Sequence, residues 1–261
     1  MSAPRPPMVI EDERAPLSLP PGECPAPTPI VFDGPHGPLA GFHHVARPPI
    51  ARASTVVLCP PVGYDAMCTH RTYRHLAERL SALGFHVLRF DYHGTGDSSG
   101  RQEEPGRVAA WLASIDTAID QIRARSGIRP TCLFGVRTGA LLAAAAADRR
   151  SDVATLVLWA PGQNGRTYVR EFRAFNAAKE TSASGNGAPE KKDEVVAGYF
   201  FSAETLEALS QINLLAAEFG AVKRALVLGR DDVPGPEPRL VAHLTAKGVK
   251  AEHPSVRDTP A

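Results

Sequence analysis

The clearest chemical pattern in the sequence is residues 135–139 (GVRTG), which lie between an apolar stretch, residues 131–134, and a run of small residues, 140–147. Two glycines around a tight strand-to-helix turn let the middle residue project from a strained bend. The N–H groups at the helix start then point toward a developing anion. This is the G-x-S-x-G arrangement of a nucleophile elbow, with Arg137 at the serine position. Arginine cannot act as a nucleophile, but it binds carboxylates or phosphates bidentately. Arg137 is therefore either an anion-binding residue at the catalytic position or a salt-bridged residue that braces neighbouring loops.

Two further loops would complete such a site. Residues 59–65 (CPPVGYD) follow a short β-branched run, and here the N–H of Val62 is the expected second oxyanion donor, beside that of Thr138. Pro61 has no N–H to offer. Asp232 follows the apolar run 225–228 and is the expected acid of a triad, where it would orient a histidine. A rigid turn at 59–65 and a solvated turn at Asp232 are the alternatives.

The histidine that such an acid would orient is not well placed. His253 falls within the last predicted strand, and only eight residues follow it. His70 and His93 lie on loops at strand ends, where we expect them to contact substrate. Ser98 does not lie at the elbow, and we expect it to stabilise a turn.

The elements that must position these residues alternate along the chain. Short β-branched runs and amphipathic helical patterns follow one another from residue 55 to 159 and resume at 225, which predicts an α/β fold with a mostly parallel sheet. Two strands around the turn at 33–38 precede them. This alternation of strands and helices is interrupted at residues 163–217, which we expect to form an inserted lid. Phe172 and Phe200 belong to an aromatic group in this lid that suits an apolar or acyl substrate, or that packs the lid onto the body.

Composition narrows the classes of function. The 261 residues include 29 Lys and Arg against 28 Asp and Glu, which gives no reason to expect nucleic acid as a partner. No apolar run approaches the roughly 20 residues that span a bilayer, and residues 1–17 lack the apolar segment of a secretory signal. The four cysteines form no zinc pattern, so we expect no metal, no cofactor and a cytoplasmic location. Fifteen of the 24 prolines lie at or before Pro61, and residues 1–28 are expected to be a proline-rich tail.

Together these segments resemble the α/β-hydrolase superfamily, in its serine aminopeptidase-like branch. The residues that carry the resemblance are 87–100 (VLRFDYHGTGDSSG) and the elbow. Residues 134–144 (FGVRTGALLAA) and 194–202 (EVVAGYFFS) also resemble the exosortase A system-associated hydrolases of type 2, which tend to carry arginine at the elbow. The resemblance implies an eight-stranded sheet flanked by helices, with a lid after the sixth strand. The hydrolase core would then comprise residues 29–162 and 218–261.

Three functions remain open at this point. The first is an enzyme acting on a small ester, thioester or acyl substrate with a degenerate triad, by hydrolysis or by a non-hydrolytic step such as cyclisation or elimination. The second is a catalytically inactive pseudo-hydrolase that serves a biosynthetic or exopolysaccharide pathway as a binding or partner protein. A pathway protein or a second copy of the chain would be its macromolecular partner. The third is a conventional serine hydrolase with its nucleophile elsewhere.

Overall fold

A twisted eight-stranded sheet organises the chain in the computed structural model, which describes residues 26–47, 52–180, 193–230 and 235–254. The spatial order of its strands is β1-β2-β4-β3-β5-β6-β9-β10. β1 and β2 form an antiparallel hairpin, β2 is also antiparallel to β4, and all other pairs are parallel. The strands are β1 (Thr28–Gly34), β2 (Gly37–His44), β3 (Thr55–Cys59), β4 (His86–Phe90), β5 (Thr131–Val136), β6 (Val153–Trp159), β9 (Arg224–Leu228) and β10 (Lys250–Glu252).

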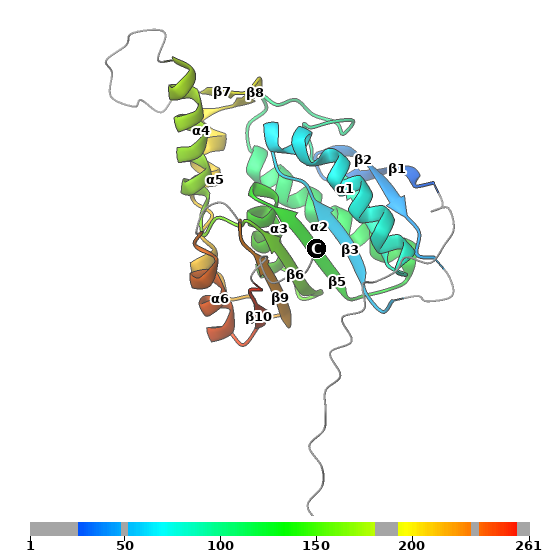
Figure 1. Cartoon of the computed structure of the whole chain (residues 1–261). Coiled ribbons are helices and arrows are strands. Elements are labelled where there is room, and N and C mark those ends of the chain that lie inside the picture. Colours follow the sequence, from blue (N-terminus) through cyan, green and yellow to red (C-terminus); the bar gives the residue numbers. More distant parts are fainter. Residues whose placement is uncertain (1–25, 48–51, 181–192, 231–234, 255–261) are drawn as a thin grey trace, which may run out of the picture.

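Helices cover both faces of this sheet. The four that connect its strands are α1 (Tyr64–Ala82), α2 (Arg107–Ser126), α3 (Thr138–Asp148) and α6 (Glu237–Ala246). Val57 of β3 packs in one apolar cluster with Ile115 of α2 and Leu141 of α3, whereas Val56 and Leu58 pack in a second cluster with α1. Because alternate residues of a strand point to opposite faces, α1 lies on one face and α2 and α3 lie on the other (Figure 1). The predicted fold class, a mostly parallel eight-stranded sheet flanked by helices, is confirmed.

Between β6 and β9 the chain leaves the sheet. We call residues 163–180 and 193–217 the lid segment; it contains α4 (Gly165–Glu180), β7 (Glu194–Val196), β8 (Tyr199–Phe201), α5 (Ala203–Ser210) and the 3₁₀ turn η1 (Leu214–Ala216). Its two ends pair with each other, since Gly165 N–H donates to the Ile212 carbonyl (2.9 Å) and Leu214 N–H donates to that of Gln163 (2.9 Å). The β7–β8 hairpin forms a small sheet of its own, and Figure 1 shows it near the start of α1. Of the predicted tail, residues 1–28, the first 25 residues lie outside the part of the chain that the structure describes, and β1 begins at Thr28.

Two buried histidines end β2. His43 Nε2 lies 3.1 Å from His86 Nδ1, and His44 Nε2 accepts a hydrogen bond from Arg89 Nε (3.1 Å). Burial lowers the pKa of both His43 and His44 to about 4, and positive neighbours act in the same direction. Both imidazoles are therefore neutral at neutral pH.

This neutrality predicts that the protein loses stability in mild acid. Between about pH 6.5 and pH 4 the unfolded chain binds protons at both histidines that the folded chain excludes, so the free energy of unfolding falls as the pH falls. At pH 5 the loss is on the order of 2 kcal/mol for each histidine. Urea unfolding at pH 8 and pH 5 measures it. The variant H43Q/H44Q, which cannot titrate at these sites, should show a clearly smaller difference; an equal difference in both proteins would contradict the assignment.

Candidate functional site at the strand ends

The turn from β5 into α3 has the tight geometry that the two glycines predict. Arg137 adopts φ 53° and ψ −119°, a backbone conformation that residues other than glycine rarely take. A Cβ on Gly135 would lie 2.4 Å from the Gly139 carbonyl oxygen, and one on Gly139 would lie 2.4 Å from that of Cys59. Neither glycine therefore tolerates a side chain without movement of the backbone. The turn presents Arg137 at the carboxyl end of the sheet.

The Arg137 side chain is held by two carboxylates from different parts of the fold. Its Nε donates to Asp65 Oδ2 at 2.6 Å, and its Nη2 donates to Glu171 Oε2. Asp65 belongs to the first turn of α1, while Glu171 belongs to α4 of the lid segment. The guanidinium also lies 5.6 Å from the centre of the Tyr168 ring, again on α4. Arg137 thus joins the elbow and α1 to the segment inserted between β6 and β9.

The two carboxylates keep the Arg137 guanidinium in its charged form. Burial opposes the charged form of Arg137, but the hydrogen bonds and charges of Asp65 and Glu171 outweigh it and raise the pKa of the guanidinium further. The two carboxylates together exceed the single positive charge. An anionic substrate at Arg137 would meet the net negative charge of these two carboxylates, so the structure favours the bracing alternative over the anion-binding one.

The predicted oxyanion donor has a partner inside the protein. Val62 N–H donates to Thr138 Oγ1 at 2.9 Å, and both residues are buried. An oxyanion can therefore use the Val62 N–H only if the Thr138 hydroxyl moves away. The structure brings Val62 and Thr138 together, but in a contact with each other.

Two cavities lie beside the elbow. The smaller, about 260 Å³, is lined by Arg137, Glu171 and Phe172, among others. The larger, about 930 Å³, is lined by His70 and Phe200 but not by Arg137. Both touch Val62, Gly63 and Phe201, and the Phe172 ring stacks on that of Phe201 with centroids 5.0 Å apart. Phe172 and Phe200 thus line neighbouring cavities, as side chains that contact substrate would.

His93 does not reach either cavity. Its ring is buried, and Nε2 lies 2.9 Å from Glu104 Oε2. Its backbone N–H donates to Ser114 Oγ at 3.1 Å. These contacts give His93 a role in holding the loop after β4, and they do not favour the predicted contact with substrate.

The remaining parts of a triad are not assembled among the described residues. Asp232 lies outside them. His253 Nδ1 donates to the Val227 carbonyl at 2.8 Å, whereas a triad histidine uses this nitrogen to donate to a carboxylate. Ser98 Oγ donates to the Asp91 carbonyl (2.7 Å) and accepts from Ala40 N–H (2.9 Å), in keeping with the expected structural role.

The partners of Arg137 were not identified from the sequence. Asp65 is present in the predicted loop 59–65, and Glu171 lies one helical turn after Tyr168 on α4. A carboxylate on the aromatic face of that helix is the one sequence feature that could have pointed to Glu171 as a partner of Arg137. Within the described ranges, no cluster of three or more His, Cys, Asp or Glu side chains is suited to a metal ion. In the same ranges no helix combines the length and the apolar character needed to cross a bilayer.

Comparison with known proteins gives this geometry a context. Residues 62–192, half of the chain, match the family model described as serine aminopeptidase, S33. The human protein ABHD12B is 38% identical over 102 residues, which cover 36% of this chain and 27% of that protein. The lysophosphatidylserine lipase ABHD12 of Gallus gallus is 36% identical over 95 residues, covering 35% and 24% respectively. The matched stretch thus spans about a quarter of these relatives' own length.

Solved structures share the fold at low sequence identity. The structure of DcsB in complex with its substrate analogue superposes with a TM-score of 0.62 at 12% identity, covering 87% of this chain and 89% of that one. The Pyrococcus furiosus esterase Pf2001 gives a TM-score of 0.61 at 17% identity, covering 88% and 82%. At these identities the likeness concerns the fold alone.

The position of Arg137 predicts that its removal loosens the lid segment. In Arg137→Ala both ion pairs to Arg137 are lost and two carboxylates face each other without a cation, so we expect a destabilisation of about 1–3 kcal/mol. Hydrogen exchange of α4 amides should rise at least several-fold relative to the wild type. Arg173→Ala is the matched control, because Arg173 lies on the same helix and pairs with Glu194 inside the lid segment. Equal exchange in both variants would contradict the bridging role.

The Val62–Thr138 hydrogen bond predicts a second effect on stability. Thr138→Val keeps the shape of the side chain but leaves the buried Val62 N–H without its acceptor, which should cost about 1–3 kcal/mol. Thr138→Ser retains the hydroxyl and is the control. Chemical unfolding of the three proteins measures the difference, and a Val variant as stable as the Ser variant would show that Val62 has another acceptor.

Proposed function

Because the chain belongs to the serine aminopeptidase S33 family and has the α/β-hydrolase fold, we propose that it is a pseudo-hydrolase: a protein that binds a small acyl- or ester-type molecule at the strand ends without forming an acyl-enzyme. One observation carries this proposal. The nucleophile position is occupied by Arg137, and its guanidinium is paired with Asp65 and Glu171.

The chemistry of the elbow supports a binding role. Covalent acyl transfer needs a nucleophilic side chain next to a base, and a guanidinium that stays protonated cannot supply the attacking electron pair. The Val62 N–H is directed to Thr138 Oγ1, and His253 Nδ1 is directed to the sheet. In the part of the chain that the structure describes, the elbow thus has no nucleophile, the Val62 N–H is engaged by Thr138, and the His253 ring is engaged by the sheet.

The cavities support the class of ligand. A volume of about 930 Å³ falls within the range of small-molecule sites, and aromatic side chains form much of its wall. The names of the relatives, a lysophosphatidylserine lipase and an esterase, support an acyl- or ester-type ligand. The resemblance of residues 134–144 and 194–202 to exosortase A system-associated hydrolases supports a place in a biosynthetic or exopolysaccharide pathway.

A second candidate is an enzyme with altered machinery. The elbow keeps its strained turn, and Arg137 lines the smaller cavity, where an anionic substrate group would meet it. In this candidate a substrate carboxylate or phosphate replaces Glu171 or Asp65 at the guanidinium, and the reaction is hydrolytic or a cyclisation or elimination. The ion pairs of Arg137 with Asp65 and Glu171 make this altered enzyme the less favoured of the two candidates.

The proposal predicts that a fluorophosphonate probe does not label the protein. A serine esterase serves as the positive control, and intact-mass measurement reports the adduct. Arg137→Ser should also remain unlabelled, because restoring the hydroxyl provides neither the base nor the free Val62 N–H. Stoichiometric labelling of a serine in the wild type would overturn the proposal and restore a conventional hydrolase.

Turnover separates the two candidates. The wild type should not cleave p-nitrophenyl esters of two to eight carbons above the buffer rate. If it does, and if Arg137→Ala loses this activity while its unfolding transition remains cooperative, the second candidate replaces the first.

A further inference from the structure

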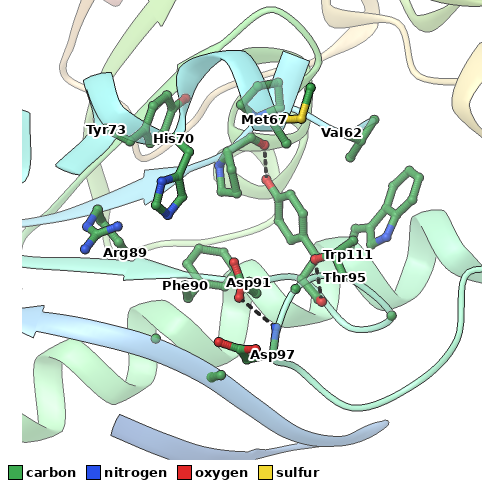
Figure 2. A pocket seen from close by; sticks show the side chains of 18 of the residues that line it. Val62, Met67, His70, Tyr73, Arg89, Phe90, Asp91, Thr95, Asp97 and Trp111 are labelled. Carbon is green, nitrogen blue, oxygen red and sulfur yellow. Dashed lines mark hydrogen bonds between the residues drawn. The ribbon is translucent and has the colours of Figure 1, made fainter. Parts of the chain in front are cut away.

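The larger cavity is built from separate parts of the chain. Its wall comes from the β1–β2 hairpin, the loop after β3, α1, the loop after β4, the start of α2 and β8. Figure 2 shows Met67 and His70 of α1 above the cavity and Asp91 and Asp97 of the loop after β4 below it. One part of the wall is therefore apolar and another is polar, and each restricts the ligand in its own way.

Exposed apolar side chains gather at this cavity. Val31 of β1 is 71% exposed, Phe42 of β2 is 38% exposed and Met67 of α1 is 59% exposed, and all three line the cavity. Phe200 of β8 lines it as well. Exposed apolar side chains that come together from separate elements mark a binding groove, because an apolar ligand removes them from water. The apolar part of the wall therefore fits the chain of an amphipathic molecule.

The polar part carries charges of both signs. Arg89 and Arg107 line the cavity, and so do Asp91 and Asp97, so that the formal charges of these four side chains cancel. Burial raises the pKa of Asp91, while the nearby charges of His70 and Arg89 act in the opposite direction. A ligand with a net charge therefore finds no excess of the opposite charge among these four side chains.

Donors and acceptors of the polar part are both left open. Arg89 donates through Nε to His44 at 3.1 Å, while its two terminal nitrogens have no acceptor among the described residues. Its guanidinium lies 5.0 Å from the centre of the Phe42 ring, which places it beside the apolar part. Asp91 accepts the Asp97 N–H with Oδ2 at 3.0 Å, and within the same ranges its Oδ1 has no hydrogen-bond donor. A ligand can therefore accept from a guanidinium and donate to a carboxylate at this wall.

The head group that can use both sides of this wall is an uncharged one with hydroxyl groups. An ammonium would gain from Asp91 but face Arg89, whereas a carboxylate or phosphate would gain from Arg89 but face Asp91. A hydroxyl donates one hydrogen bond and accepts up to two, so several hydroxyls on one head can serve both residues. No further charge then loses its water, and hydrogen bonds to charged partners are the stronger ones.

We propose that the larger cavity binds an uncharged amphipathic molecule whose head carries several hydroxyl groups, as in a glycoside that bears an alkyl or acyl chain. The hydroxyls lie against Arg89 and Asp91, and the chain lies along Met67 and Phe200. The volume of about 930 Å³ falls within the range of sites for ligands of this size. The inference rests on the proposed binding function and names the head group of its ligand.

Four ligands with one chain length test the head group. Octyl β-D-glucoside, octan-1-ol, octylamine and octanoate share an eight-carbon chain and differ in the head. Calorimetric titration into the full chain at neutral pH, below the solubility and aggregation limits of the ligands, should give the glucoside a dissociation constant at least tenfold lower than that of each of the others. A glucoside that does not bind, or that binds no more tightly than octanol, would overturn the inference. Octylamine or octanoate binding as tightly as the glucoside would overturn it as well.

Two charge variants locate the head group. Asp91→Asn and Arg89→Gln each remove one of the two opposite charges and should each weaken glucoside binding about tenfold. Octanol binding should stay unchanged, which also shows that the cavity is intact. Octanoate should bind D91N more tightly than the wild type, and octylamine should bind R89Q more tightly. Asp33→Asn is the matched control, an exposed carboxylate on β1 that does not line the cavity. Variants D91N and R89Q that bind the glucoside as the wild type does would overturn the inference.

The two proposals fail separately. Fluorophosphonate labelling would overturn the pseudo-hydrolase assignment whatever the glucoside result. Absence of a preference for the glucoside would overturn the head-group site and leave that assignment in place.

Discussion

The ion pairs of Arg137 with Asp65 and Glu171 determine how the strand ends are organised. A guanidinium raised on a strained turn needs partners, and here they come from the start of α1 and from the lid helix α4. Because the three groups belong to three elements, the pairing fixes α1, the elbow and α4 relative to one another. A hydroxyl at the same position would leave these two carboxylates without their cation, so the ion pairs depend on having an arginine at the elbow.

The rest of the site follows from this pairing. With Arg137 and its partners filling one end of the smaller cavity, the free volume lies on the other side of the loop after β3, around Val62 and Gly63. In that loop the Val62 N–H donates to Thr138. The loop therefore separates the two cavities, and its residues line both of them. The stacked rings of Phe172 and Phe201 extend the wall into the lid. The Arg137 side chain is therefore held by ion pairs, and open volume remains beside it in the smaller cavity and on the far side of this loop in the larger one.

The fold was accessible from the sequence because strand and helix periodicities are local. The β-branched runs, the amphipathic spacing of α2 and the paired glycines each constrain only a few consecutive residues, and all of them correspond to elements of the structure. The role of Arg137 was not accessible, since its partners lie 72 and 34 residues away along the chain. His70 and His93 illustrate the same limit. Both follow strand ends, but irregular loops have no periodicity that reveals which side chain faces a cavity, and only His70 does so.

The two groups of charges at the strand ends lead to different behaviour toward ligands. At the elbow, opposite charges are within hydrogen-bond distance, so an anionic ligand would compete there with Asp65 and Glu171 for the Arg137 guanidinium. In the larger cavity, burial raises the pKa of Asp91, and the nearby charges of His70 and Arg89 act in the opposite direction. A raised carboxylate pKa means that the ionised form is held at a cost, which these two neighbours reduce in part. The two sites therefore present different charges to a ligand: an arginine held by two carboxylates at the elbow, and a partly buried carboxylate with positive neighbours in the larger cavity.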